Sequence, residues 1–111
     1  FARRALYSLL DNVQEIRADH NADLLVEGII VNQFQGRATL PQAIVDELRS
    51  EGLPVLDAML SASVKIKESH QRALPMIHLD RQHKLTREYV QLFDFLEAAR
   101  KARAKAAKKQ P

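Results

Sequence analysis

The first apolar residues of the chain recur at helical spacing. Aliphatic side chains follow one another at intervals of mostly three or four positions, with charged residues between them, at Leu6, Leu9, Leu10, Val13 and Ile16. This pattern places them on one face and predicts a helix from about Arg3 to His20. The turn-forming run Asn21-Ala22-Asp23 is expected to end it.

The next apolar run is continuous rather than periodic. Leu25 to Val31 is rich in branched aliphatic residues, and its apolar core, Gly28 to Val31, has no polar position. Such a run is typical of a strand that is covered on both faces. It stops at the polar pair Asn32-Gln33, which therefore marks the carboxyl end of the predicted strand.

A second helix and a second strand follow. Thr39-Leu40-Pro41-Gln42 has the form of a capping box with proline in the first turn, and Gly52 closes the helix that it opens. Pro54-Val55-Leu56 is predicted to be a short strand. The rest of the chain is expected to hold a turn or short helix at Val64–Arg72, a brief extended piece at Pro75-Met76-Ile77, and a last helix from about Leu85.

This order of elements predicts an α/β fold. Helices and strands alternate, and such connections favour a parallel sheet. Two strands cannot complete a sheet whose strands are apolar on both faces. We therefore expect the C-terminal part of a larger α/β domain, with a doubly wound, mostly parallel sheet and flanking helices. The missing strands are expected in sequence that is not present here, and an opening residue of Phe1 rather than Met agrees with a fragment.

Charge is divided unevenly along the chain. The net charge is +3, from 17 basic and 14 acidic residues. Six of the basic residues and no acidic residue lie from Arg100 onward, so residues 1–99 carry 11 basic against 14 acidic residues, a charge of −3. The sequence thus divides into a domain at 1–99 and a basic tail at 100–111. The tail is expected to fray, because it has no apolar stripe beyond alanine.

Several kinds of chemistry are missing from the sequence. There is no cysteine, which excludes disulfides and thiolate sites and suits a reducing cytosol. No apolar run reaches the roughly 20 residues that cross a bilayer. The three glycines are too far apart to form a phosphate-binding loop, and the four histidines show no metal-ligand spacing. We expect neither a complete catalytic set nor a metal site in this chain.

Polar residues that follow the two predicted strands are the candidate binding residues. In an open α/β sheet, ligands bind beyond the carboxyl ends of the strands, which is where Asn32 is predicted to lie. Arg37, Lys65 and Lys67 also follow the strands, so these cations could share one edge of the sheet and bind phosphate. The simpler interpretations are that Asn32 only ends a strand and that the cations are ordinary surface charges.

An ordered set of motifs resembles the C-terminal portion of ParA-family partition ATPases, a branch of the P-loop NTPases that also includes MinD. The resemblance runs from Phe1 to about Ala98 and is greatest to the plasmid-type ParA and IncC proteins. Its motifs are, in order, Leu6-Tyr7-Ser8-Leu9-Leu10, Val26-Glu27-Gly28-Ile29-Ile30-Val31-Asn32, Arg37-Ala38-Thr39-Leu40, Val45-Asp46-Glu47-Leu48, the turn from Leu60 to Ser69, and Pro75-Met76-Ile77.

The resemblance implies an ATP-dependent switch in plasmid or chromosome segregation. In that family, ATP and Mg²⁺ drive homodimerisation and nonspecific DNA binding on the nucleoid, in the bacterial cytoplasm. A centromere-bound partner of the ParB type stimulates hydrolysis and release. The phosphate loop and the magnesium ligands of the family belong to its N-terminal half, so this chain alone is expected to be inactive.

By the same resemblance, two places in this chain contact adenine. Asn32 matches the strand-end asparagine that reads the base, and the loop that packs on the base is matched by Leu60, Ser61, Ala62 and Ser63. Many relatives have Ile-Pro-Arg-Asn in this loop, so backbone contacts are expected here in place of side-chain contacts. Arg37 and Lys65 match basic positions associated with DNA binding, and Lys67 could extend them.

Two other functions are open to this sequence. A MinD-like positioning ATPase would bind membrane through a C-terminal amphipathic helix with bulky apolar residues, whereas the chain beyond Leu96 offers only alanine between its basic residues. A stand-alone basic adaptor would bind nucleic acid through the tail alone. The partners expected from the resemblance are DNA and a ParB-type protein, and no membrane.

Overall fold

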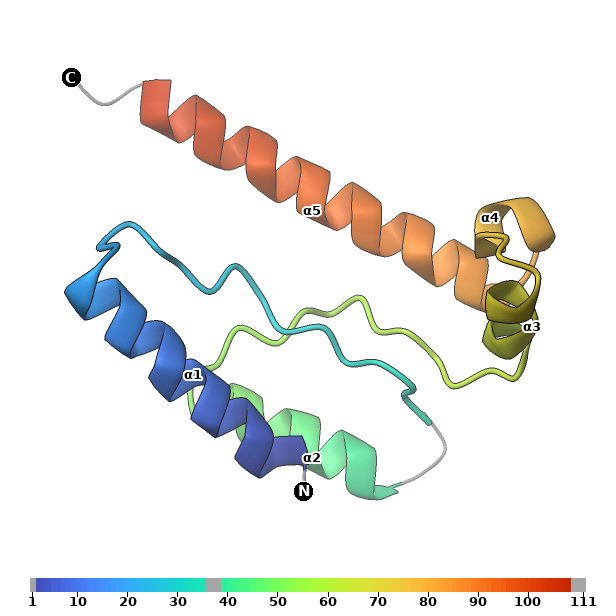
Figure 1. The fold of residues 1–111 in the computed structure, drawn as a ribbon, viewed down its shortest axis with the longest axis horizontal. Coiled ribbons are helices and arrows are strands. Elements are labelled where there is room, and N and C mark those ends of the chain that lie inside the picture. Colours follow the sequence, from blue (N-terminus) through green and yellow to red (C-terminus); the bar gives the residue numbers. More distant parts are fainter. Residues whose placement is uncertain (1, 36–38, 109–111) are drawn as a thin grey trace.

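A computed structural model describes residues 2–35 and 39–108 of the chain. These residues form five helices, which are α1 (Ala2–Asp19), α2 (Thr39–Ser50), α3 (Lys65–Gln71), α4 (Met76–Leu79) and α5 (Lys84–Lys108). In the view of Figure 1, two extended segments run between α5 and the pair α1 and α2, while α3 and α4 lie at the N-terminal end of α5. The described part of the chain is therefore mainly helical.

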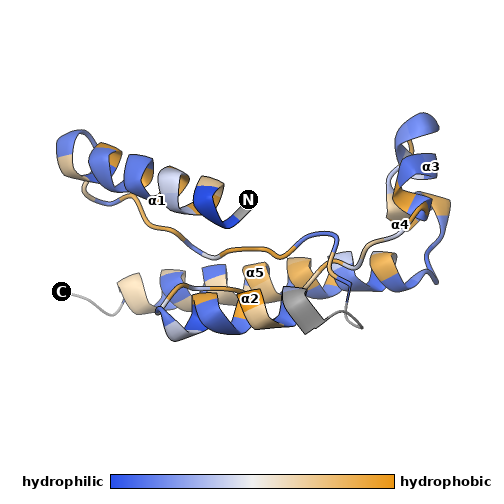
Figure 2. Cartoon of the chain, turned by 90° about the horizontal axis from the view of Figure 1, so that it is seen from below, coloured by the Kyte–Doolittle hydropathy of each residue, from blue (hydrophilic) through white to orange (hydrophobic). Residues whose placement is uncertain are grey.

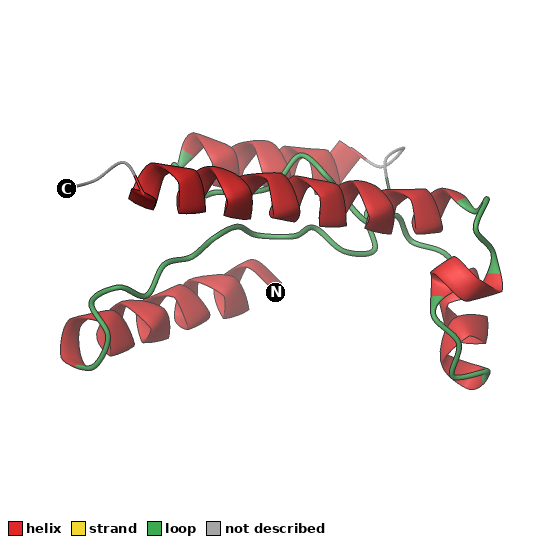
Figure 3. Ribbon diagram, turned by 90° about the horizontal axis from the view of Figure 1, so that it is seen from above, coloured by secondary structure: helices red, strands yellow, loops and turns green. Residues whose placement is uncertain are grey.

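The two predicted strands are extended segments that form no sheet. They run parallel to one another and are joined by two isolated bridges, Ile29 with Val55 and Phe34 with Ser61. Figure 3 draws both segments as loops, and the described ranges contain no strand. The prediction of an α/β fold with a doubly wound parallel sheet is therefore wrong.

A break in the hydrogen bonding explains the missing sheet. A parallel ladder needs evenly spaced hydrogen bonds along both segments. Here the carbonyl of Ile29 accepts a hydrogen bond from Leu56, whereas the carbonyl of Val31 accepts one from Leu60, both at 2.9 Å. Two residues on the first segment are thus matched by four on the second, which bends at Asp57. The regular register is lost between the two bridges.

The helices arise where apolar spacing and end signals predict them, with one exception. Gly52 has a φ of 85°, the left-handed conformation that commonly follows a helix C-terminus, and it comes shortly after α2. The extended piece predicted at 75–77 is wrong, because Met76 and Ile77 belong to α4. Pro75 precedes α4 with a φ of −57°, a value that suits the entry to a helix as well as an extended chain.

Two small clusters of buried apolar side chains form the core. One joins α5 and α4 to the second extended segment and consists of Leu56, Leu60, Met76, Leu85 and Leu92. The other joins α2 to the same segment and consists of Val45, Leu48 and Val55. The neighbours Val55 and Leu56 belong to different clusters, as expected where successive side chains of an extended backbone point to opposite faces. The second extended segment therefore links the two clusters.

Large apolar side chains also remain at the surface. The exposed fraction is 65% for Leu25 and 63% for Phe93, and Figure 2 shows apolar positions along the extended segments and α5. Tyr89 and Phe93 of α5 are both exposed and line an open groove of about 940 Å³ together with residues of α3 and α4. Among the described residues, no helix is both long and apolar enough to cross a membrane.

Helix α5 continues through the first part of the basic tail. The sequence predicts fraying from Arg100, whereas the structure describes this segment as helical as far as Lys108. The Arg103 guanidinium lies 2.8 Å from Oε1 of Glu27 in the first extended segment. Arg100 lies 3.1 Å from Oε2 of Glu97, and this hydrogen-bonded cation holds the pKa of the Glu97 carboxyl below its ordinary value.

Candidate functional site

The structure brings the two candidate adenine-contacting elements together. The backbone N–H of Leu60 donates to the carbonyl of Val31 at 2.9 Å, and the N–H of Phe34 donates to the carbonyl of Leu60 at 2.8 Å. Asn32 lies between Val31 and Phe34 in the chain, so hydrogen bonds on both of its sides hold it beside Leu60. Asn32 therefore lies at the edge of the turn 60–63.

Asn32 is part of a sharp local bend. Its side-chain Oδ1 accepts a hydrogen bond from the backbone N–H of Gln33 at 2.9 Å. Gln33 has a φ of 55°, in the left-handed region that residues other than glycine seldom adopt. Asn32 is exposed, and its NH₂ group donates no hydrogen bond within the described part of the chain. The side chain can therefore still donate to a ligand, and its oxygen keeps a second lone pair.

The turn 60–63 is held by a carboxylate from α5. Oε1 of Glu88 accepts a hydrogen bond from the backbone N–H of Ser61 at 2.8 Å, and Oε2 accepts one from the Ser61 hydroxyl at 2.7 Å. Glu88 and Ser61 are both partly buried. Hydrogen bonds to an ionised acceptor are stronger than those between neutral groups, so this contact fixes the backbone of the turn at Ser61.

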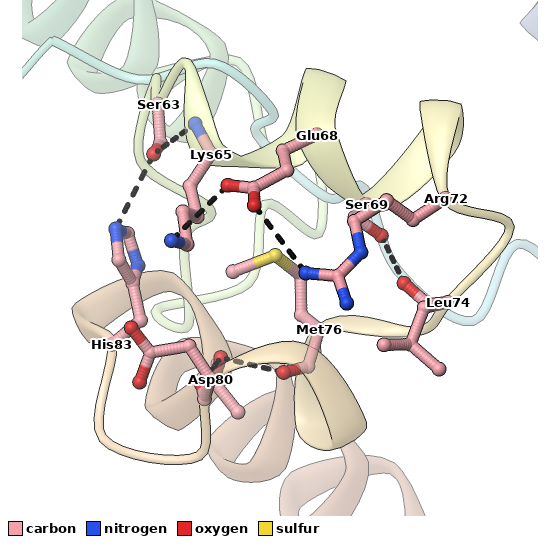
Figure 4. A network of polar contacts seen from close by, with 10 residues as sticks. Ser63, Lys65, Glu68, Ser69, Arg72, Leu74, Met76, Asp80 and His83 are labelled. Carbon is pink, nitrogen blue, oxygen red and sulfur yellow. Dashed lines mark hydrogen bonds and ion pairs between the residues drawn. The ribbon is translucent and has the colours of Figure 1, made fainter.

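A second contact joins the end of the turn to the start of α5. The Ser63 hydroxyl lies 3.5 Å from Nε2 of His83 and accepts a hydrogen bond from the backbone N–H of Lys65 at 3.1 Å (Figure 4). Nδ1 of His83 accepts a hydrogen bond from the N–H of Leu85 at 3.0 Å. His83 therefore links the turn to the first turn of α5.

Sequence reasoning did not single out Glu88 or His83. For Glu88 a signal was present, because it lies three positions after Leu85 and four before Leu92, on the face that α5 buries. A carboxylate on a buried helix face requires hydrogen-bond donors. The identity of the donor, Ser61, has no local signal, since no helical or strand period connects it to Glu88.

The predicted cations differ in their surroundings. Nζ of Lys65 lies 3.1 Å from Oε2 of Glu68, whose other oxygen lies 3.5 Å from the guanidinium of Arg72 (Figure 4). The hydrogen bond and charge of Lys65 hold the pKa of the Glu68 carboxyl below its ordinary value, and Arg72 adds to this effect. Lys67 is exposed and makes no ion pair in the described ranges. Arg37 lies outside the described residues.

Lys65 and Lys67 do not form one patch by themselves. They are two positions apart in α3, and side chains at that spacing point to different sides of a helix. A clearer alignment of cations lies at the C-terminal end of α5, where Lys101, Lys105 and Lys108 follow one another at intervals of four and three. This set, the basic stripe, is exposed and makes no ion pair within the described chain.

The described residues contain no group of three histidine, aspartate or glutamate side chains that could hold a metal ion. The groove beside α5 contains none of the predicted site residues and is lined mainly by apolar side chains, so it is not suited to phosphate. The chemistry available at Asn32 and the turn 60–63 is hydrogen bonding to a planar polar group, by an amide and by backbone atoms.

Comparison with known proteins finds distant relatives over most of this chain. It is 24% identical over 109 residues to a chromosome partitioning protein ParA of Caulobacter vibrioides, an alignment that covers 96% of this chain. It is 25% identical over 93 residues to an uncharacterized protein of Pseudomonas putida, which covers 83% of this chain. The chain spans 41% and 35% of the lengths of these two relatives. No family model matches the chain.

Proposed function

We propose that this chain supplies the adenine-contacting turn and part of the DNA-binding surface of an ATP-dependent DNA-partition protein. Two independent observations support the proposal. The alignment with the Caulobacter ParA protein covers 96% of this chain, so it includes the whole segment from Asn32 to Lys67. Backbone hydrogen bonds also place Asn32 beside the turn 60–63, as a shared base site requires.

The residues present fit the base of a nucleotide and do not fit its phosphates. The Asn32 amide can donate to a ring nitrogen and accept from an amino group, the two groups that adenine presents on one edge. The described residues contain no group of three potential metal-ligating side chains, and the sequence contains no glycine-rich loop. In this proposal the phosphates of ATP and the Mg²⁺ ion are therefore held by another part of a larger protein, which dimerises when ATP is bound.

The proposed DNA surface consists of cations, of which Lys67 and the basic stripe are exposed and Lys65 is partly exposed. Lys65, Lys67 and the basic stripe can neutralise phosphates, and Arg37 is assigned to the same role by the resemblance alone. The resemblance implies DNA binding without sequence preference, and contacts to phosphate carry no sequence information, so binding should be independent of sequence. A ParB-type protein is the proposed regulator of hydrolysis, and the nucleoid is the proposed location.

The single observation that carries the proposal is the placement of Asn32 beside the turn. The test measures the affinities of the complete gene product for ATP and GTP by equilibrium titration. Asn32→Ala should weaken ATP binding by about 1–3 kcal/mol, because one hydrogen-bonding group at the base is lost or left unpaired. Asn12→Ala, an exposed asparagine in α1, is the matched control and should leave both affinities unchanged. Equal ATP affinities in wild type and Asn32→Ala would contradict the proposal.

A stand-alone adaptor is the second candidate. The observation in its favour is that the basic stripe lies on an ordered helix, so its cations need no further ordering before they bind phosphate. An adaptor of this kind would bind DNA equally well with and without ATP. A nucleotide titration of DNA binding by the complete gene product therefore separates the two candidates.

A further inference from the structure

The carboxylate of Glu88 determines which hydrogen-bonding groups the turn 60–63 can offer to a ligand. Its two oxygens accept the backbone N–H and the hydroxyl of Ser61, at 2.8 and 2.7 Å. Glu88 lies on α5 between the buried Leu85 and Leu92, so packing on both sides limits the movement of its side chain. The contact joins residues that are 27 positions apart in the chain.

Three consecutive backbone donors of the turn are engaged. The N–H of Leu60 donates to Val31 O at 2.9 Å, that of Ser61 donates to Glu88, and that of Ala62 donates to Phe34 O at 3.1 Å. The carbonyl of Ser61 accepts no hydrogen bond within the described part of the chain. A ligand that rests on residues 60–62 therefore finds acceptors, in the form of a carbonyl and a nearby carboxylate, and no unengaged backbone donor.

We propose that Glu88 is a specificity-determining residue, which acts through Ser61 so that the backbone of residues 60–62 accepts hydrogen bonds from a ligand and does not donate them. Such a turn favours a base with an exocyclic amino group at the contacted edge. Adenine carries an amino group at the position where guanine carries an oxygen. A backbone that offers only acceptors at residues 60–62 can hydrogen-bond the amino group of adenine. The same backbone would leave the oxygen of guanine facing another acceptor, which is unfavourable. This inference rests on the proposed nucleotide-binding function and adds the residue that sets the choice between ATP and GTP.

The test compares ATP and GTP affinities of the complete gene product by equilibrium titration. Glu88→Met retains much of the apolar bulk beside Leu85 and Leu92 but has no carboxylate, so the Ser61 N–H becomes free to donate to guanine. The ratio of ATP to GTP affinity should fall by about three- to tenfold, the worth of one hydrogen bond. Glu88→Gln should keep the ratio close to wild type, because its amide oxygen can accept from the N–H while its NH₂ group donates to the hydroxyl.

A second substitution tests whether Glu88 acts through the Ser61 N–H. Proline has no N–H. Ser61→Pro therefore removes the donor itself, and adding Glu88→Met to Ser61→Pro should leave the ATP to GTP ratio unchanged. Glu97→Ala, which removes another carboxylate of α5, is the control and should have no effect on the ratio. Should Glu88→Met fail to fold, Glu88→Asp gives the same comparison, because its shorter side chain moves the carboxylate away from Ser61.

The outcomes separate this inference from the proposed function. If Asn32→Ala weakens ATP binding while neither Glu88→Met nor Glu88→Asp changes the ratio, the role of Glu88 is overturned and the nucleotide site stands. If Glu88→Gln lowers the ratio as much as Glu88→Met, charge and not hydrogen bonding is responsible, and the inference is also overturned. If the wild-type protein binds neither nucleotide, the proposed function itself fails.

Discussion

The side chain of Leu56 lies directly against the backbone of Gly28. A Cβ atom on residue 28 would be 2.6 Å from Cδ2 of Leu56 and 3.0 Å from its Cγ. Leu56 is buried in the cluster that contains Met76 and Leu85, which restricts its alternatives. Glycine at position 28 therefore allows the two extended segments to approach one another beside the bridge between Ile29 and Val55.

Gly28→Ala should destabilise the protein by about 1–3 kcal/mol, because the added methyl group overpacks this contact. Urea unfolding followed by circular dichroism measures the change. In the Gly28→Ala background, Leu56→Ala should cost less than it does alone, since the smaller side chain removes the clash. Gly52→Ala is the comparison, because nothing lies near its added Cβ and its cost arises from the φ of 85°. Strict additivity between positions 28 and 56 would contradict the packing argument.

The helices were largely predictable, whereas the absence of a sheet from the described residues was not. Local spacing decides which face of these helices is apolar, so the limits of α1 and α2 and the start of α5 follow from the sequence to within a residue or two. The C-terminal end of α5 at Lys108 does not. The run Gly28–Val31 correctly indicates an extended backbone. Whether extended segments form a ladder depends on register over distant residues, and here the four-residue advance from Leu56 to Leu60 disrupts it. No pattern within either segment reports that mismatch.

The candidate site was predictable in its parts and not in its connections. The motifs of the resemblance singled out Asn32 and the turn 60–63, and the structure places them side by side. Glu88 carried a signal that was not used, a carboxylate at helical spacing from Leu85 and Leu92. Its partner could be known only from the fold. The pairing of Lys65 with Glu68 was within reach, because the two are three positions apart in a helix.

The purified 111-residue chain should not hydrolyse ATP. Phosphoryl transfer depends mainly on positioning and on stabilisation of charge at the phosphates, and the sequence has no glycine-rich phosphate loop. Release of inorganic phosphate with ATP and Mg²⁺ is the measurement, and the complete gene product is the comparison. Sustained Mg²⁺-dependent hydrolysis by the chain alone would show that the phosphate-binding groups have been assigned to the wrong part of the protein.

Removal of Lys65 should raise the pKa of Glu68. The pKa of this carboxyl is held below its ordinary value of 4.5, first by the hydrogen bond from Lys65 and then by its charge, with a smaller effect from Arg72. Nuclear magnetic resonance titration of the Glu68 carboxyl carbon should show a larger rise in Lys65→Ala than in Arg72→Ala. An unchanged pKa in Lys65→Ala would mean that the pair does not persist in solution.

The ion pair between Lys65 and Glu68 also determines how the stability of the protein should change with pH. Because the folded-state pKa of Glu68 is lowered, its contribution is fully present above the unfolded-state pKa and is lost as pH falls through the folded-state pKa. The contribution should be small, since both partners are exposed to solvent and salt screens them. The acid-side loss of stability should therefore be slightly smaller in Glu68→Gln than in wild type, as measured by urea unfolding between pH 3 and 6 (about the range over which carboxylates titrate).

DNA binding by the complete gene product should depend steeply on salt. Each phosphate contact that is lost should reduce the slope of log affinity against log salt by about 0.9. Replacing the basic stripe, Lys101, Lys105 and Lys108, by alanine removes three exposed cations from one helix face, and Lys65→Ala with Lys67→Ala removes two from α3. Both sets should weaken binding to all duplexes alike. Arg17→Ala, an exposed cation of α1, is the control and should leave the slope unchanged.

The ion pair between Lys65 and Glu68 leads to a further prediction about DNA binding. Glu68 partly neutralises Lys65 at 3.1 Å and places a negative charge where a DNA phosphate would approach. Glu68→Gln should therefore strengthen DNA binding, and the gain should disappear when Lys65→Ala is added, because the released cation is then absent. An equal gain in both backgrounds would indicate only a general reduction of negative charge.

The DNA-binding measurements also separate the two candidate functions. If substitution of the basic stripe alone abolished binding, with and without ATP, α3 would carry no DNA contact and the adaptor function would be preferred.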